Sequence, residues 1–309
     1  MDLISVLIQL LGFHAPQHIK YFIFFVFFII YCATICGNLL IITLVSYSKS
    51  LHSPMYFFLF HLSVSDILLI TTILPNMLYD VLMEETTMPF SGCISQLYFF
   101  AVAGMLECLL LAVMSFDRYS AICRPLHYNL IMNLKFCWVM VSICWALSIF
   151  VIFVYALIIS QLQFCDLNII DHYFCDFDPI LELSCSDTIM VQIALKSAIA
   201  IVVVMPFCTI IVSYIYIIVT IFKIHSISGR KKVFSTCSSH LTVVSIYYGT
   251  LFCVHLIPSR GKTWNSSKYL SLMYTLVTPL LNPIIYSLRN KDFKNAAGKL
   301  INFLLVYYQ

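Results

Sequence analysis

The chain has 309 residues, of which 61% are hydrophobic and only 10% are charged, with a formal net charge of +3 and a mean hydropathy of +0.96. Soluble domains carry about 25% charged residues, so this composition excludes a water-soluble globular domain. The sequence indicates an integral membrane protein.

A helical membrane span needs about 20 apolar residues, and seven stretches of the chain reach this length. They lie at about 22–46, 55–79, 95–122, 136–160, 189–222, 233–257 and 269–288. Because these runs are continuous rather than alternating, they exclude the strands of a membrane barrel. We predict an all-α membrane protein: one domain, 1–309, forming a seven-helix bundle, with a short amphipathic helix over 290–303.

The basic residues orient this bundle. With the N-terminus outside, five of the 17 Lys and Arg residues fall outside and twelve inside, as the positive-inside rule requires. Acidic residues crowd one outer loop, between the fourth and fifth spans. The apolar stretch 3–13 follows no Lys or Arg, so we expect a tail on the membrane surface or the bundle rather than a signal peptide.

Two acids, Asp66 and Glu107, lie deep within the second and third spans. At a rise of 1.5 Å per residue, both sit about 16 Å from the inner face. Two carboxylates at one depth would hold a cation or share a proton. The alternative is that each bonds a separate polar neighbour, such as Asn38 or Asn282.

Four cysteines, Cys93, Cys165, Cys175 and Cys185, fall on the outer, oxidising side, where disulfides are expected. Four cysteines allow three connectivities, and the spacing does not choose between them. The chain has no C-x-x-C or H-E-x-x-H motif, which argues against a zinc site.

The inner ends of the spans carry the remaining polar motifs. Asp117 and Arg118 are adjacent opposite charges where lipid meets water, which suggests a charge pair that can open. The triplet Arg230-Lys231-Lys232 either anchors the helix at lipid headgroups or forms a partner-binding face. The Asn282-Pro283 step frees a backbone carbonyl within the last span and suits a hinge.

Asp117-Arg118-Tyr119 closing the third span and Asn282-Pro283-x-x-Tyr286 closing the seventh resemble a rhodopsin-like G protein-coupled receptor. Four longer stretches resemble vertebrate olfactory receptors, and the likeness covers essentially the whole chain. These stretches are residues 51–57 (LHSPMYF), 114–128 (MSFDRYSAICRPLHY), 235–241 (STCSSHL) and 279–290 (PLLNPIIYSLRN).

The resemblance implies an odorant receptor that binds a small, largely apolar ligand in the outer half of the bundle. It also implies activation of a stimulatory, olfactory-type G protein that raises cAMP. The expected location is the plasma membrane, multi-pass with the N-terminus outside, in the cilia of olfactory sensory neurons. No enzyme activity, nucleic-acid partner or cofactor is expected, apart from a sodium ion at Asp66 and Glu107, the family's buried acid pair.

The resemblance also assigns roles to single residues. Asp117 would hold Arg118 at rest, and Arg118 would turn toward the G protein on activation. The same activation and coupling set contains Tyr119, Tyr214, His240, Asn282, Pro283 and Tyr286. The family pattern pairs Cys93 with Cys175 and Cys165 with Cys185.

The chain departs from the family pattern in two places. Phe116 and Ser120 stand where the family usually has Tyr and Val. The N-terminal tail lacks an Asn-x-Ser/Thr sequon, and the only one in the chain begins at Asn265, in the third outer loop close to the membrane.

A ligand cavity between the third, fifth, sixth and seventh spans would have a lining of small and apolar residues with few polar groups, as a small apolar ligand requires. In the sixth span, Tyr248, Leu251, Phe252 and His255 follow helical spacing, a pattern that ordinary helix packing also produces. The predicted lining residues are Phe100, Ala101, Gly104, Met105, Ala198, Val202, Tyr248, Leu251, Phe252, His255 and Thr275.

Three alternatives remain at this point. A rhodopsin-like receptor for a non-odorant small molecule would share every motif above. A transporter or channel would want internal repeats and paired broken helices, which the sequence lacks. An enzyme would need a nucleophile, a base and an orienting group, and no such set is recognisable.

Overall fold

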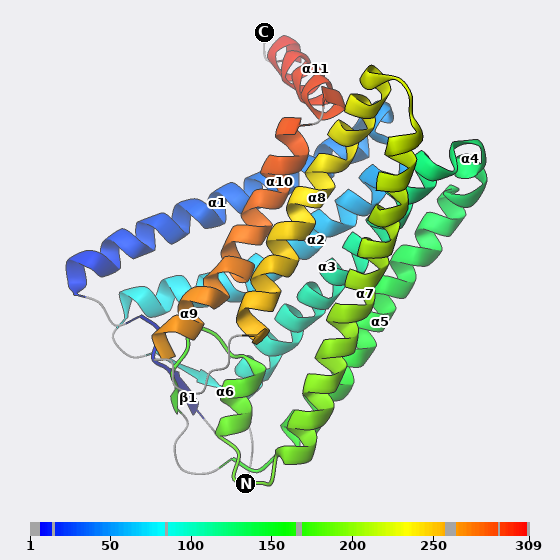
Figure 1. The fold of residues 1–309 in the computed structure, drawn as a ribbon. Helices are drawn as coiled ribbons and strands as arrows, with labels where there is room; N and C mark the ends of the chain where they lie inside the picture. The colour runs from blue at the N-terminus through cyan, green and yellow to red at the C-terminus, as the bar shows by residue number, and fades with distance from the viewer. Residues whose placement is uncertain are drawn as a thin grey trace.

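The computed structural model describes residues 7–13, 16–83, 86–164, 169–256, 264–289 and 291–307. Within them the chain forms a bundle of long helices that run roughly side by side (Figure 1). The long helices are α1 (Gln17–Tyr47), α2 (Pro54–Leu82), α3 (Phe90–Cys123), α5 (Leu134–Ser160), α7 (Ile189–Lys223) and α8 (Ile227–Leu256), followed by a composite segment of α9 (Trp264–Leu272), the π-helical turn η4 (Met273–Val277) and α10 (Thr278–Arg289).

Six membrane-crossing candidates are found among the described residues, by length and composition. The first five are α1, α2, α3, α5 and α7, and the sixth covers Lys268–Ser287 in the composite segment. Helix α8 is not among them. It begins with polar and basic residues at Ile227, ahead of the apolar stretch predicted from 233, so part of its length belongs outside the hydrocarbon.

Helices α1, α2 and α3 run past the predicted apolar stretches at both ends, and prolines mark their starts. Pro16 and Pro89 directly precede α1 and α3, and Pro54 is the first residue of α2. Proline suits these positions because the first amides of a helix need no internal partner. The apolar pattern reports the hydrocarbon thickness, whereas the helix itself ends where the backbone changes direction.

Helix α3 lies at the centre of the bundle. In its most apolar stretch 67% of residues are buried, against 22% in α5 and in α7 and 17% in α1. The peripheral helices instead expose large apolar side chains, such as Phe22, Phe25 and Phe150. This distribution is expected where lipid covers the outer faces, and it makes α3 the helix through which the two ends of the bundle connect.

The end of the bundle that the charge count places outside is called the outer end below. There, β1 (Leu7–Leu10) pairs antiparallel with β2 (Thr86–Pro89) and parallel with β3 (Ile169–Ile170), in the order β2-β1-β3. We call this sheet and the short helix α6 (Phe177–Glu182) the outer cap. The N-terminal tail, expected on the membrane surface or the bundle, forms one strand of this sheet. The sequence does not predict the sheet, because strands this short show no readable alternation of apolar and polar residues.

Two cross-links hold the outer cap to the helices. Lys268 forms an ion pair with Asp171 and donates a hydrogen bond of 2.8 Å to the carbonyl of Gly12, joining the last segment to the outer loop and the tail. Cys93 at the start of α3 forms a disulfide with Cys175, with Cα atoms 5.5 Å apart. The predicted pairing of these two cysteines is confirmed.

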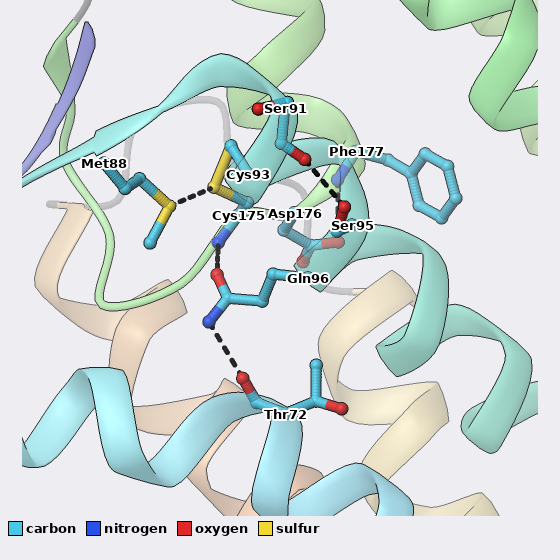
Figure 2. The surroundings of a disulfide bond; sticks show 9 residues. All are labelled: Thr72, Met88, Ser91, Cys93, Ser95, Gln96, Cys175, Asp176 and Phe177. Atoms are coloured by element: carbon cyan, nitrogen blue, oxygen red, sulfur yellow. Dashed lines mark hydrogen bonds between the residues drawn. A yellow bond between two sulfur atoms is a disulfide. The ribbon is translucent and has the colours of Figure 1, made fainter.

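Figure 2 shows how the disulfide is supported: the Gln96 side chain accepts a hydrogen bond from the Cys175 amide at 3.0 Å and donates one to the Thr72 carbonyl at 3.1 Å. Helices α2 and α3 therefore both hold the loop at Cys175. Cys185 is also disulfide-bonded. Its predicted partner Cys165 lies outside the described residues.

At the opposite, inner end, η3 (Pro125–His127) and α4 (Tyr128–Ile131) connect α3 to α5. Helix α11 (Lys291–Tyr307) follows the last segment and extends beyond the predicted limit of 303. Tyr56 donates a hydrogen bond of 3.2 Å to Asp292 and packs edge-on against Phe293, at 5.4 Å between ring centroids. These contacts fix the start of α11 against α2.

The outer cap should be sensitive to acid through His172. Burial and, to a lesser degree, the charge of Lys268 lower the pKa of His172 to about 3, against the opposing effect of Asp171. An unfolded histidine protonates near pH 6.5, so the folded cap binds fewer protons and loses stability as pH falls below that value, by about 2 kcal/mol near pH 5.

Thermal unfolding of the purified receptor at about pH 7.5 and about pH 5 measures this loss. The His172→Phe variant should show a smaller loss on acidification, because phenylalanine does not titrate. His127→Phe, at an exposed inner position, serves as the control and should behave like the native chain. An unchanged acid sensitivity in His172→Phe would contradict the assignment.

Candidate ligand cavity and inner charge cluster

A cavity of about 150 Å³ lies toward the outer end of the bundle, among α3, α5, α7 and α8, with residues of the outer cap contributing to its wall. Most of its lining is aliphatic or aromatic. Seven of the predicted ligand-contact residues line it: Phe100, Ala101, Gly104, Met105, Ala198, Val202 and Leu251. The structure thus brings the predicted faces of α3 and α7 to one space.

Gly104 shows why that space exists. A Cβ atom built on Gly104 would meet no atom within 4 Å, so the missing side chain leaves open volume in the centre of the wall. The carbonyl of Gly104 accepts a hydrogen bond of 2.8 Å from the Tyr247 hydroxyl across the bundle. A glycine in α3 therefore both widens the cavity and brings α8 close to the same turn.

Three of the other predicted residues, Tyr248, Phe252 and Thr275, are not among the described residues that line the cavity. Tyr248 is turned away and packs against Phe207, at 4.9 Å between ring centroids, and Phe252 packs on the same ring at 5.1 Å. Thr275 is fully buried and bonds the carbonyl of Ser271 at 2.8 Å. The side chain of His255 lies outside the described residues.

Sequence reasoning missed four polar lining residues: Tyr155, Asp176, Tyr247 and Tyr274. Tyr247 lies one residue before the predicted stripe on α8, a rotation of about 100° that periodicity alone does not fix. Asp176 comes from the outer loop, and helical periodicity predicts only residues on the faces of helices. Its position beside Cys175 was the available signal, because the disulfide draws that loop over α3.

The buried acid pair combines both of the alternatives left open by the sequence. Asn282 donates to both carboxylate oxygens of Asp66, at 3.0 and 3.1 Å. Asp66 and Glu107 are neighbouring, fully buried carboxyl groups. Both oxygens of Glu107 are buried without a donor among the described residues. Two carboxylates in contact need a proton or a cation between them.

Asp117, Arg118 and Tyr128 form what we call the inner charge cluster. Arg118 is paired with Asp117, its Nε 2.9 Å from Oδ2, while Tyr128 donates to Oδ1 at 2.8 Å. Asp117 is fully buried and the Arg118 side chain is 11% exposed. Burial and the neighbouring carboxylate raise the pKa of Tyr128, so its hydroxyl keeps the proton that it donates. The carboxylate is satisfied from two sides, which holds Arg118 against α3.

A second contact joins α3, α7 and α8 about two turns above this cluster. His240 Nε2 lies 3.1 Å from the Leu111 carbonyl and must donate to it, so Nδ1 accepts the Tyr214 hydroxyl at 2.7 Å. Tyr119 lies nearby, with its ring 5.8 Å from the Arg124 guanidinium carbon. Predicted coupling residues from three helices are therefore gathered at the inner end.

The last segment contains the predicted hinge. Pro283 lies within α10 and packs against Gly37 of α1, where an added Cβ would come within 3.0 Å of the proline ring. Asn38 donates to the Pro279 carbonyl at 3.2 Å. The Tyr286 hydroxyl is buried with no hydrogen-bond partner among the described residues. The backbone of Asn265 lies in α9, and its side chain is outside the described part.

Comparisons with known proteins agree with this arrangement. A family model described as olfactory receptor matches residues 27–303. Mouse olfactory receptor 1M1 is 45% identical over 91% of this chain and 90% of its own, and human olfactory receptor 11L1 is 44% identical over 95% and 91%. The crystal structure of squid rhodopsin superposes with a TM-score of 0.74 at 18% identity, covering 96% of this chain and 89% of that one.

The likeness to squid rhodopsin establishes the rhodopsin-like helical fold, and the sequence matches establish the family, which comprises signalling receptors rather than enzymes. The predicted fold class and family are confirmed. The chain belongs to the olfactory receptor family of multi-pass, rhodopsin-like G protein-coupled receptors.

Proposed function

We propose that this receptor binds a small, largely apolar odorant in the cavity beneath the outer cap and activates a stimulatory, olfactory-type G protein, raising cAMP. The observation that carries this proposal is that one buried helix, α3, holds the cavity wall at Gly104 and the inner charge cluster at Arg118. These residues are about 21 Å apart along the helix axis. The plasma membrane of olfactory cilia, with the N-terminus outside, is the proposed location.

Signalling follows as a population shift between two helix arrangements. In the resting arrangement, Asp117 and Tyr128 hold Arg118 in place, and Tyr214 is bonded to His240. A ligand that fits the cavity better when α7 and α8 shift would favour an arrangement in which these contacts part. In that arrangement the G protein could contact Arg118, and Tyr214 and Tyr286 could bond to each other or to Arg118.

The Asp66–Glu107 pair is proposed to hold a sodium ion, with a shared proton as the alternative. The residues present fit such an ion: two neighbouring buried carboxyl groups, one of which lacks any donor among the described residues. When bound, sodium supplies positive charge between the carboxylates. Asn282, which bonds Asp66, would transmit occupancy of the pair to the hinge at Pro283.

Replacing Arg118 by alanine should lower the maximal odorant-evoked cAMP response roughly tenfold or more, while odorant binding persists. The reason is that the inner charge cluster lies far from the cavity and serves only the output. A cAMP assay, with ligand-induced thermal stabilisation as the binding measure, checks both halves. Lys135→Ala, at an exposed inner position, is the control. Full signalling by Arg118→Ala would refute this role.

Replacing Gly104 by leucine should weaken odorant potency roughly tenfold or more, because the new side chain fills the open volume in the cavity wall. Dose-response curves normalised to surface expression measure the effect. Gly249→Leu is a matched control, since an added Cβ there also meets nothing within 4 Å but the residue is exposed and does not line the cavity. Unchanged dose-response curves for Gly104→Leu would contradict the assignment of this cavity as the odorant site.

Sodium should raise the thermal stability of the receptor relative to choline at equal ionic strength, by about 3 kcal/mol at a hundredfold excess over the dissociation constant. The Glu107→Gln variant should lose this increment because one carboxylate is gone. Glu182→Gln, in the outer cap, should retain it. If sodium has no effect on the native chain and Glu107→Gln alters only its pH dependence, the pair shares a proton instead.

A further inference from the structure

The cavity contains one charged side chain among its described lining residues, the carboxylate of Asp176. No lysine, arginine or histidine is among these described lining residues, so within them the charge has no basic counterpart. An acid facing an otherwise apolar wall is costly unless hydrogen-bond donors satisfy it. The stability of this carboxylate therefore depends on the hydrogen-bond donors that the protein supplies and on any further donor that a ligand supplies.

The protein fixes the position of Asp176 from three sides. The neighbouring Cys175 is tied to α3 by the disulfide, as Figure 2 shows, and Asp176 is the N-cap residue of α6. Its Oδ1 accepts the Phe177 amide at 2.8 Å. The Tyr274 hydroxyl lies beside the carboxyl group and favours its ionised form. A carboxylate has about four acceptor positions, so two donors leave it able to accept more.

The hydroxyl donors of the cavity wall, by contrast, are already engaged. Tyr247 donates to the Gly104 carbonyl at 2.8 Å, and Tyr155 donates to the Ala194 carbonyl at 3.2 Å. The Tyr274 hydroxyl lies beside Asp176 itself. Each hydroxyl has a single proton. Among the described side chains the wall therefore presents a strong acceptor to a ligand, and its hydroxyl protons are committed elsewhere.

We propose that Asp176 is the polar anchor of the cavity and that it selects ligands with a hydrogen-bond-donating head group, aliphatic alcohols or amines, over aldehydes, ketones and esters. Carboxylic acids are excluded by repulsion between like charges. This inference rests on the proposed function, because it names the ligand class of the same cavity. The apolar chain of the ligand would lie along α3 and α7, past Gly104 and Ala198.

The electrostatics of Asp176 support this selection. Burial raises its pKa to about 6, against the lowering effect of the Phe177 amide, so the group is still mostly ionised at neutral pH. A buried carboxylate gains from each donor it receives. A carbonyl oxygen in the same place would lose its bonds to water and meet another acceptor, which leaves two buried acceptors unsatisfied.

The test compares head groups on one carbon chain. Hexan-1-ol, hexylamine, hexanal and hexanoic acid, together with their eight-carbon counterparts, are measured for thermal stabilisation of the purified native receptor and for cAMP. We expect the alcohols or the amines to bind roughly tenfold or more tightly than the aldehyde of the same length. The acids should bind weakest. This rank order needs no variant, so it decides the proposal even where a variant fails to express.

Asp176→Asn then tests the residue itself. Asparagine caps a helix as well as aspartate does and keeps the oxygen that accepts the Phe177 amide. The variant should lose most of the preference for donor head groups and should gain affinity for the aldehyde, because the new amide can donate. Asp178→Asn, an exposed acid on the same short helix, is the matched control and should keep the native rank order.

Several results would overturn the anchor role: an aldehyde or acid that binds as tightly as the alcohol, no binding by any donor-bearing compound, or unchanged alcohol affinity in Asp176→Asn. Binding in the expected order without cAMP would instead contradict the proposed signalling function and leave the ligand class standing. A cAMP response confined to aldehydes would support the signalling function and contradict the proposed ligand class.

Discussion

A polar group inside a membrane must find its partner within the protein, because lipid offers none, and this constraint organises the whole bundle. Side chains on one helix repeatedly bond carbonyl groups on another. Asn38 reaches Pro279 across α1 and α10, Ser65 reaches Ala103 across α2 and α3, and His240 reaches Leu111 across α8 and α3. Each such bond fixes the rotation of two helices at once, which apolar contacts with lipid on the far side would not do.

Helix α3 takes part in more of these functional contacts than its neighbours because it is the most buried. Its outer end is held by the disulfide and by Gln96, its middle opens at Gly104 and carries Glu107, and its inner end presents Asp117 and Arg118. The proposed signalling requires that the helices around α3 have two arrangements, of which this structure shows one. Such bistability is what lets a small change at one end be read at the other.

The sequence predicted what depends on composition and on local charge, and missed what depends on rotation. Long apolar runs gave the spans, and the adjacent charges Asp117 and Arg118 gave the inner charge cluster, because both are costly anywhere else. The face of α8 was placed one residue off, at Tyr248 instead of Tyr247.

The last segment failed for a related reason. Its π-helical turn, Met273–Val277, adds a residue to the turn and shifts the face on which Thr275 lies, so a stripe drawn with ordinary helical spacing does not apply. The outer cap lay beyond sequence reasoning for a different reason. Its strands are two to four residues long and pair with segments far away in the sequence, so only tertiary contacts define them.

The outer cap also strengthens the effect that the Asp176 carboxylate is proposed to have on ligand selection. By covering the mouth of the bundle, the sheet and α6 reduce the access of water, and electrostatic interactions strengthen as the local dielectric falls. The same disulfide that ties the cap to α3 places Asp176 at the cavity wall. In the proposed receptor, the disulfide therefore serves both the covering of the cavity, which Lys268 also supports, and its chemical selectivity, while the helices beneath contribute mainly shape.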